Sequence, residues 1–177
     1  MSAEQDILES LDRAIRSPRA AAYLDSLAAD VTRTLYRDPG ARLAWNTVPL
    51  EIYDPLPEGI RSSWIFVLRA GCSSGAERHP NSIQRVMSLG GWADMRTWDG
   101  KRWMSNLLRS DAGRLENRWL SIPTNVWHRP VMDDVDWLVV SFHTASDAEL
   151  IEELPLDDEH PDRGTRAREV YAGRQAR

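Results

Sequence analysis

The chain has 177 residues, with 27 acidic and 22 basic side chains, so its formal net charge at pH 7 is −5. This length suits one domain with its own core, and a hydrophobic fraction of 42% is ordinary for a globular protein. The mild acidity disfavours nucleic acid or an anionic membrane as a partner, because both bind basic surfaces. No apolar run is long enough to span a bilayer, so no membrane partner is expected.

Cys72 is the single cysteine of the sequence, which excludes an internal disulfide and a cysteine-based zinc cluster within it. The N-terminus is polar and acidic and does not resemble a signal peptide. We therefore expect a reduced, cytoplasmic location. Eight tryptophans lie between Trp45 and Trp137, where we expect them to form sheet core rather than an aromatic ligand cage.

Residues 1–40 predict two amphipathic helices. Apolar residues recur at helical spacing as far as Ile15. Ser17-Pro18 then suits the start of a second helix, because serine can cap it and proline needs no N–H in the first turn. Residues 38–40, Asp-Pro-Gly, end this helix. We expect the helical segment to pack on the domain that comes after it.

Residues 41–145 predict a β domain. Short apolar runs alternate with turn residues, and Asp99-Gly100 suits a two-residue hairpin. Seven to nine strands succeed one another with no helix between them, a pattern typical of an antiparallel sandwich or barrel. The predicted fold class is therefore mainly β.

Residues 146–177 predict a short C-terminal helix and a polar tail. Ser146 begins the run SDAELIEEL, in which Glu149 completes a capping box. After Pro155 the chain is almost wholly polar, so we expect a solvated tail with His160 on its surface.

The stretch from Gly71 to Gly91 carries the strongest functional pattern. Glu77 and His79 are two residues apart, so both side chains leave one face of an extended strand. A turn at Pro80 and a return strand from Gln84 would bring Gln84 beside them. The sequence therefore predicts a metal site at this corner.

The same stretch resembles the first motif of the cupin superfamily, in which two histidines and a glutamate lie between two glycines. Every interval of that motif is kept from Gly71 to Gly91, but Glu77 replaces its first histidine and Gln84 its glutamate. Residues 117–132 resemble the second motif, since Pro123 and His128 are kept and Asn125 replaces a glycine. Asparagine suits that position because it tolerates the left-handed backbone.

The resemblance implies a double-stranded β-helix, or jelly-roll, barrel with a divalent metal inside it. Carried over by position, the implied metal ligands are Glu77, His79, Gln84 and His128. Two histidines with one carboxylate favour Fe(II), although Mn, Ni, Zn or Cu also accept imidazole ligands. Gln84 could offer a weaker oxygen ligand or bind a substrate.

Two further residues are candidates for the pocket. Trp137, Val139, Ser141 and His143 share one strand face, so His143 could supply a missing ligand or act as an acid or base. A histidine bonded to backbone at a strand end is the alternative. Arg85, like Arg69 and Arg96, could bind a substrate carboxylate if it points inward, and is otherwise solvated.

The sequence supports two hypotheses for the function. The first is a metal-dependent cupin enzyme, an oxidoreductase with dioxygenase-type chemistry on a small organic molecule, with lyase or isomerase chemistry close behind. The second is a metal-free cupin that binds or senses a small molecule without catalysis. In either case a small molecule is the expected partner, and the N-terminal helices could form a homodimer contact or cover the barrel.

Overall fold

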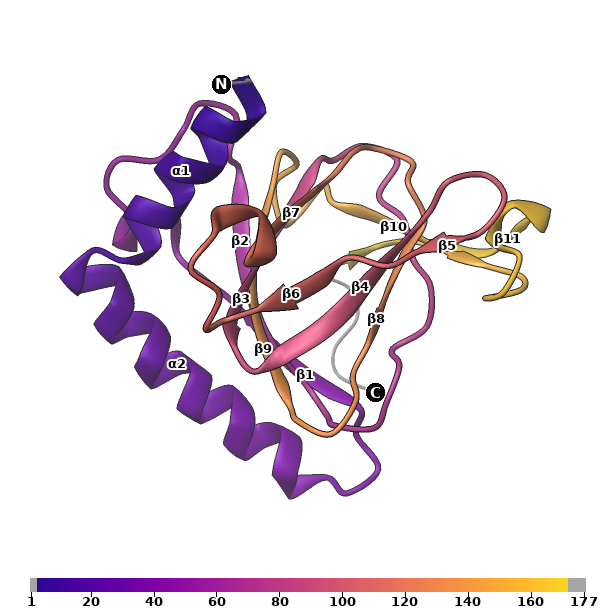
Figure 1. Ribbon diagram of the computed structural model, residues 1–177, viewed down its shortest axis with the longest axis horizontal. Coiled ribbons are helices and arrows are strands. Elements are labelled where there is room, and N and C mark those ends of the chain that lie inside the picture. Colours follow the sequence, from indigo (N-terminus) through magenta and orange to yellow (C-terminus); the bar gives the residue numbers. More distant parts are fainter. Residues whose placement is uncertain (1–2, 172–177) are drawn as a thin grey trace.

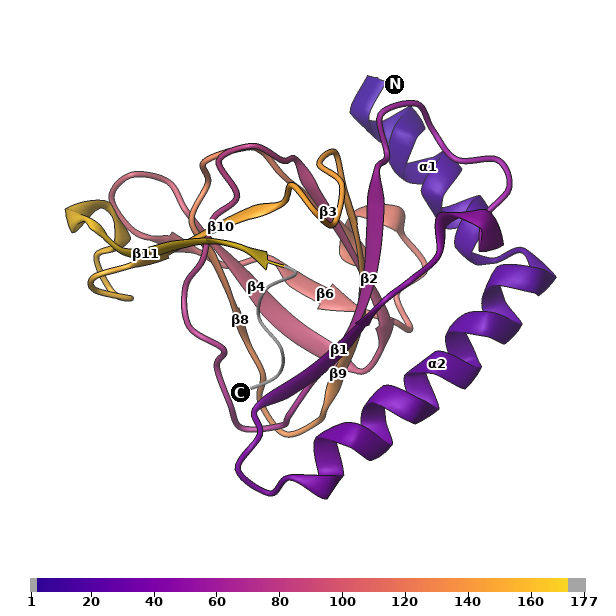
Figure 2. The same ribbon diagram turned by 180° about the vertical axis from the view of Figure 1, so that it is seen from behind.

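The computed structural model describes residues 3–171. Two helices precede the strands, α1 (Ala3–Ile15) and α2 (Pro18–Arg37). As the sequence predicts, the Ser17 side chain caps α2 by accepting a hydrogen bond from the Ala20 N–H. Both helices lie along one side of the β-barrel in Figures 1 and 2.

The strands form three antiparallel sheets. A five-stranded sheet has the order β1-β2-β9-β3-β7, β4 pairs with β5, β6 and β8 in a second sheet, and β10 pairs with β11. Nine strands thus lie between residues 41 and 145, which confirms the mainly β fold class. The strands are β1 (Leu43–Thr47), β2 (Ser62–Leu68), β3 (Gln84–Gly90), β4 (Trp92–Trp98), β5 (Trp103–Met104), β6 (Leu107–Arg109), β7 (Trp119–Ile122), β8 (His128–Val131), β9 (Trp137–His143), β10 (Ile151–Pro155) and β11 (Thr165–Val170). Short 3-10 turns occupy Leu50–Ile52, Leu115–Asn117 and Pro161–Arg163.

The five-stranded sheet is buried on both faces. On β2, Ile65 and Val67 pack with the helices, whereas Leu68 and Phe66 pack inside the barrel. This explains why β2 reads as a continuous apolar run rather than an alternating one. The helices therefore cover the outer face of the sheet, and the inner face is left to form the interior.

The backbone conformation at two turn positions explains why the motifs have asparagine at 125 and glycine at 91. Asn125 has φ of 63°, the left-handed conformation for which asparagine is an expected substitute for glycine. Gly91 has φ of 71°, and a Cβ there would overlap the backbone oxygen of Asp136. Gly91 is therefore fixed both by its backbone conformation and by a close approach of the chain.

The predicted C-terminal helix is wrong. The Ser146 hydroxyl does bond to the Glu149 carboxylate, at 2.6 Å, but the turn stops at Leu150. The next residues form β10, which pairs with β11 and exposes neither Glu152 nor Glu153. A capping pattern fixes only one turn, whereas the conformation of the residues beyond it is decided by strand pairing with distant residues.

The predicted polar tail also folds in part. The β10–β11 hairpin projects from the barrel on the side away from the helices (Figures 1 and 2). Directly after β11, the Tyr171 side chain is buried against Trp45, Trp64 and Phe66. His160 is exposed, as expected. Residues 172–177 of the predicted tail lie outside the described residues.

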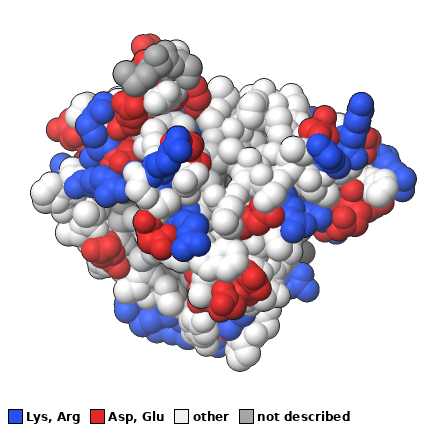
Figure 3. Space-filling model, in the orientation of Figure 1, with Lys and Arg blue, Asp and Glu red and all other residues white. Residues whose placement is uncertain are grey.

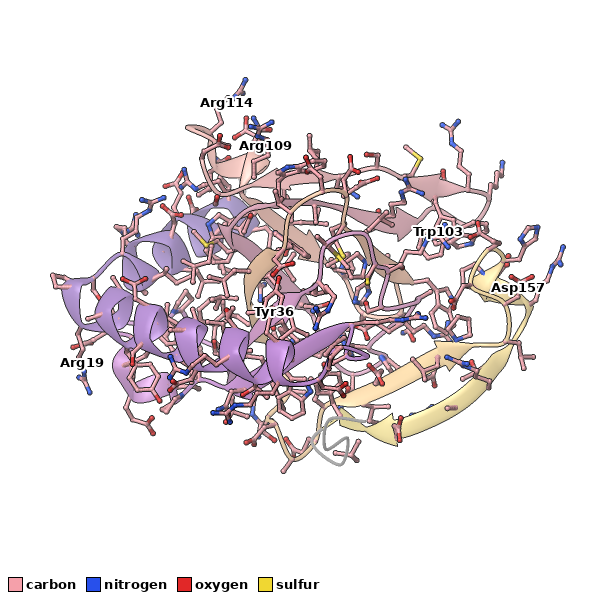
Figure 4. All side chains as sticks on the ribbon, turned by 90° about the horizontal axis from the view of Figure 1, so that it is seen from below. Arg19, Tyr36, Trp103, Arg109, Arg114 and Asp157 are labelled. Carbon is pink, nitrogen blue, oxygen red and sulfur yellow. The ribbon has the colours of Figure 1, made fainter. Side chains whose placement is uncertain are left out.

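The surface carries charges of both signs. Figure 3 shows acidic and basic side chains interspersed over the visible face, with an uncharged area between them. Figure 4 places Trp103 and Asp157 at the end of the molecule opposite Arg19, where the Arg129 guanidinium lies 4.4 Å from the Trp103 ring and binds Glu159. No helix within residues 3–171 is long and apolar enough to cross a membrane.

Candidate metal centre

The segment from Glu77 to His79 lies between two strands. Glu77 exchanges both backbone hydrogen bonds with His128, the first residue of β8, at 2.8 and 2.9 Å. Arg78 makes the equivalent pair with Glu153 of β10, at 2.9 and 3.0 Å. This extended segment turns Glu77 and His79 to one side of the strand, as predicted, and Arg78 to the other.

Three side chains converge inside the barrel. The Glu77 Oε1 atom lies 3.4 Å from Nε2 of His128 and 3.9 Å from Nε2 of His79. His79 and His128 are almost fully buried, whereas Glu77 retains 24% of its side-chain surface. Donor atoms of all three residues lie within 4.8 Å of one another. The structure thus brings together three of the four predicted ligands, one from β8 and two from the preceding segment.

Backbone carbonyls fix both imidazole rings. Nδ1 of His79 lies 3.0 Å from the Ile151 oxygen, and Nδ1 of His128 lies 3.0 Å from the Val126 oxygen. Because a carbonyl only accepts, each Nδ1 carries the proton and each Nε2 keeps its lone pair. The Nε2 atom of His128 is buried and has no hydrogen bond. Both free lone pairs are therefore on the atoms nearest Glu77.

The surroundings of His79 and Glu77 favour the protonation states in which these side chains can bind a metal ion. Burial lowers the pKa of His79 to about 4, so its imidazole is neutral at pH 7. Burial alone would raise the pKa of Glu77, but contacts with His128 and Glu152 hold it well below its ordinary value. The group therefore presents one carboxylate and a neutral imidazole.

Gln84 and His143 lie beside these three residues. They are opposite each other on β3 and β9, and both line a small cavity with His79. The Gln84 Oε1 atom is buried without a hydrogen-bond partner. The His143 ring lies 3.1 Å from the Ser141 hydroxyl through Nε2 and 3.5 Å from the Ser82 hydroxyl through Nδ1. Its pKa is far below the ordinary value because of burial.

Glu152 is a site residue that the sequence interpretation missed. It is fully buried on β10, and it helps to lower the pKa of the neighbouring Glu77 carboxyl group. The sequence predicted a capped helix over these residues and assigned no role to Glu152. The usable signal is the pair Glu152-Glu153 within an apolar run, which alternation on a strand separates onto opposite faces.

The prediction of Arg85 in the pocket is wrong. Arg85 follows Gln84 on β3 and therefore points to the opposite face of the sheet. There its guanidinium binds the Glu4 carboxylate of α1 at 2.7 and 2.9 Å. Arg69 and Arg96 also make contacts outside the pocket. The Arg69 guanidinium donates hydrogen bonds to backbone oxygens at the C-terminal end of α2 and just after it, and Arg96 pairs with Asp94.

A cavity that is partly open to solvent lies beside Glu77. Its volume is about 420 Å³, including the part open to solvent. Glu77, Gln84 and Ser141 are at its polar end. The rest of the lining is mainly apolar: Phe66, Leu68, Val86, Met95, Trp137 and Val139.

Comparisons with known proteins bear on the fold. No protein-family model matches the sequence, and no curated protein matches it significantly. Among solved structures, pumpkin seed globulin superposes with a TM-score of 0.50 at 18% identity, over 66% of this chain and 29% of that one. CapF, a capsular polysaccharide assembling protein of Staphylococcus aureus, gives 0.47 at 12% identity over 60% and 29%. An oxalate oxidase gives 0.47 at 15% identity over 61% and 53%.

The fold is that of a cupin, as the two sequence motifs indicated. The chain spans less than a third of the length of the globulin and CapF chains, and these identities show the fold alone. They indicate neither a reaction nor a substrate for this chain.

The donor set suits a divalent ion. Two imidazole nitrogens and one carboxylate oxygen converge on one point, with Nδ1–H groups bonded to carbonyls as is usual for metal-binding histidines. The orphaned Nε2 of His128 and Oε1 of Gln84 are the buried polar atoms that such an ion would satisfy. The group could hold a metal ion.

Proposed function

We propose that this protein is a metal-dependent cupin enzyme that acts on a small organic molecule at a mononuclear divalent centre. Glu77, His79 and His128 would hold the ion, and Gln84 would add a neutral oxygen or bind the substrate. The observation that supports this most is the pair of Nε2 lone pairs directed at Glu77 by backbone carbonyls.

Oxygenase-type chemistry is the leading proposal. Two histidines and one carboxylate form the ligand set that leaves positions open on non-haem Fe(II), and a bound Fe(II) would supply reaction with dioxygen at those positions. A lyase or isomerase reaction would use the same ligands with the ion as a Lewis acid. Mn, Ni, Zn and Cu remain alternative occupants.

The chain's own residues would hold and shield the reacting molecule. Phe66, Val86 and Val139 would form apolar walls around the part of the substrate beside Glu77. His143, a neutral and buried imidazole, would hold the Ser141 hydroxyl toward the same space. These residues would therefore orient a substrate at the open side of the ion.

A metal-free binding protein is the second candidate. The Glu77 carboxylate lies only 3.4 Å from His128, so the two could pair without an ion. In that case the cavity would bind a small molecule without catalysis. Metal content separates the two candidates.

The test is metal analysis of the purified full chain after reconstitution with each of the five metals in turn. We expect near-stoichiometric binding of at least one metal, lost in His79→Ala and in His128→Ala. His160→Ala is the matched control, because His160 is exposed and lies in the β10–β11 connection. Absence of metal in the wild type would refute the enzyme proposal.

Glu77→Ala tests the unusual ligand. Loss of its carboxylate removes the only charged ligand in the set, so we expect at least tenfold weaker metal binding by titration. Unchanged affinity would show that Glu77 is not a ligand. Circular dichroism of each variant checks that the barrel still folds.

A further inference from the structure

The barrel cavity has a gradient of polarity along one strand. His143, Ser141, Val139 and Trp137 succeed one another on the inner face of β9, so the lining changes from polar to apolar away from the candidate metal centre. The neighbouring strands continue the apolar end, with Phe66 and Leu68 on β2. A molecule that fills this cavity therefore meets one polar end and one apolar wall.

The cavity lining contains no lysine or arginine within residues 3–171. The nearby arginines are held outside it: Arg85 by Glu4, Arg129 by Glu159 and Arg78 by Glu153. The polar end instead carries the Glu77 carboxylate, which would repel an anion whenever no bound divalent ion offsets its charge. A substrate carboxylate or phosphate has no cationic side chain to bind here.

Gln84 shows which polar group fits the polar end. Its Oε1 atom is buried, lacks a partner and lines the cavity. An amide oxygen accepts a hydrogen bond, so a hydroxyl group on the ligand would satisfy it. The neutral acceptor and the apolar wall together select an uncharged molecule with a hydroxyl at one end.

We propose that the cavity binds an uncharged, mainly apolar small molecule, of the phenol or hydrophobic alcohol class, with its hydroxyl group toward Gln84 and Glu77. This inference rests on the proposed function and specifies its substrate class. The side chains of Phe66, Val86 and Val139 line the cavity and would pack against the apolar part of such a molecule.

The test compares two probes of the same shape by isothermal titration calorimetry. 2-Naphthol carries a hydroxyl and 2-naphthoate a carboxylate on the same ring system. We expect 2-naphthol to bind at least tenfold more tightly to the full chain from which the metal has been removed with a chelator. Equal or tighter binding of 2-naphthoate to that metal-free chain, or no binding of 2-naphthol to it, would overturn the proposal.

Two neighbouring valines supply matched variants. Val139 lines the cavity, whereas Val140 faces the helices. We expect Val139→Phe to weaken 2-naphthol binding at least tenfold and Val140→Phe to change it less than threefold. Met95→Phe, from another strand, gives a second filled cavity if Val139→Phe does not fold. Unchanged affinity in a folded cavity variant would place the ligand elsewhere.

The two proposals can fail separately. The apolar wall does not depend on an ion, so a chain that binds no metal but prefers 2-naphthol refutes the enzyme proposal and keeps the ligand class. A chain that binds metal but prefers 2-naphthoate once the metal has been removed does the reverse.

Discussion

Arg85 and Glu4 form a bidentate ion pair that joins β3 to α1, with Nε–Oε1 and Nη2–Oε2 distances of 2.7 and 2.9 Å. Arg85 is buried, and the Ser121 hydroxyl also bonds to the Glu4 carboxylate. The first turn of α1 is thereby attached to the outer face of the five-stranded sheet. Gln84, the neighbour of Arg85 on β3, points to the other face of this sheet, toward the candidate metal centre.

Glu4→Gln removes the negative partner of a buried guanidinium. We expect the free energy of unfolding to fall by about 1–2 kcal/mol, less than for a fully buried pair because Glu4 is partly exposed. Asp6→Asn in the same helical turn is the control, and we expect a change below about 0.5 kcal/mol. Urea unfolding measures both, and equal effects would show that the ion pair adds nothing. Metal content should not change in either variant.

Asp12 gives the structure a dependence on pH. Burial alone would raise the pKa of Asp12, but hydrogen bonds from Trp119, Arg118 and Arg16 bring it below its ordinary value of 3.8. Since the folded-state pKa is the lower one, the carboxylate stabilises the fold above about pH 3.8. This contribution is lost as the pH falls through the folded-state pKa.

Asp12→Asn tests that contribution. We expect the variant to be less stable than the wild type by about 1–3 kcal/mol at pH 6, with the difference shrinking as the pH approaches 2. Asp25→Asn, at an exposed position of α2, is the control and should track the wild type. A difference that stays constant from pH 6 to pH 2 would contradict the assignment to the Asp12 charge.

Glu152, buried beside Glu77, would position that carboxylate in the proposed centre. Partners that orient a ligand typically change metal affinity by about 10- to 100-fold when they are removed. We therefore expect Glu152→Leu to weaken metal binding by roughly this factor in a competition titration with a chelator. Glu152→Gln keeps a hydrogen-bond donor and should retain most of the affinity. If both variants bind like the wild type, Glu152 has no role in orienting Glu77.

Gly91→Ala tests the close approach at the start of β4. Its φ of 71° and the close contact with the Asp136 backbone oxygen leave no room for a methyl group. We expect a loss of about 2–4 kcal/mol in unfolding free energy. Gly113→Ala is the matched control because a Cβ there meets nothing within 4 Å, so its effect should be small. Comparable losses in the two variants would show that the crowding is relieved by movement.

Local patterns predicted most of the fold. The Ser17 cap and the alternating runs depend on residues a few positions apart, and the structure contains both features. The Asp99-Gly100 pair does lie in the turn between β4 and β5, but the loop between the paired residues Trp98 and Trp103 has four residues rather than the predicted two. The capping box at Ser146 is equally local and is also present. It failed as a helix prediction because the pairing of β10 with β11 depends on residues beyond the pattern.

At the site, too, local patterns were predictable, whereas contacts between distant segments were not. Motif spacing and strand alternation predicted that Glu77, His79 and His128 meet at one point, and their donor atoms lie within 4.8 Å of one another. Alternation with Gln84 also directs Arg85 to the outer face of β3, so the strand pattern itself argues against Arg85 in the pocket. The pair Glu152-Glu153 in an apolar run signals that one of the two is buried, but the position of Glu152 beside Glu77 depends on the pairing of β10 with residues 77–79.

The strand β10 makes the site depend on the end of the chain. It supplies the Ile151 oxygen that fixes the His79 ring and the Glu152 carboxyl that contacts Glu77. A chain shortened to residue 145 would keep both cupin motifs and every predicted ligand, but His79 would be free to rotate and exchange tautomers. Transfer of this centre to another barrel therefore requires the hairpin as well as the motifs.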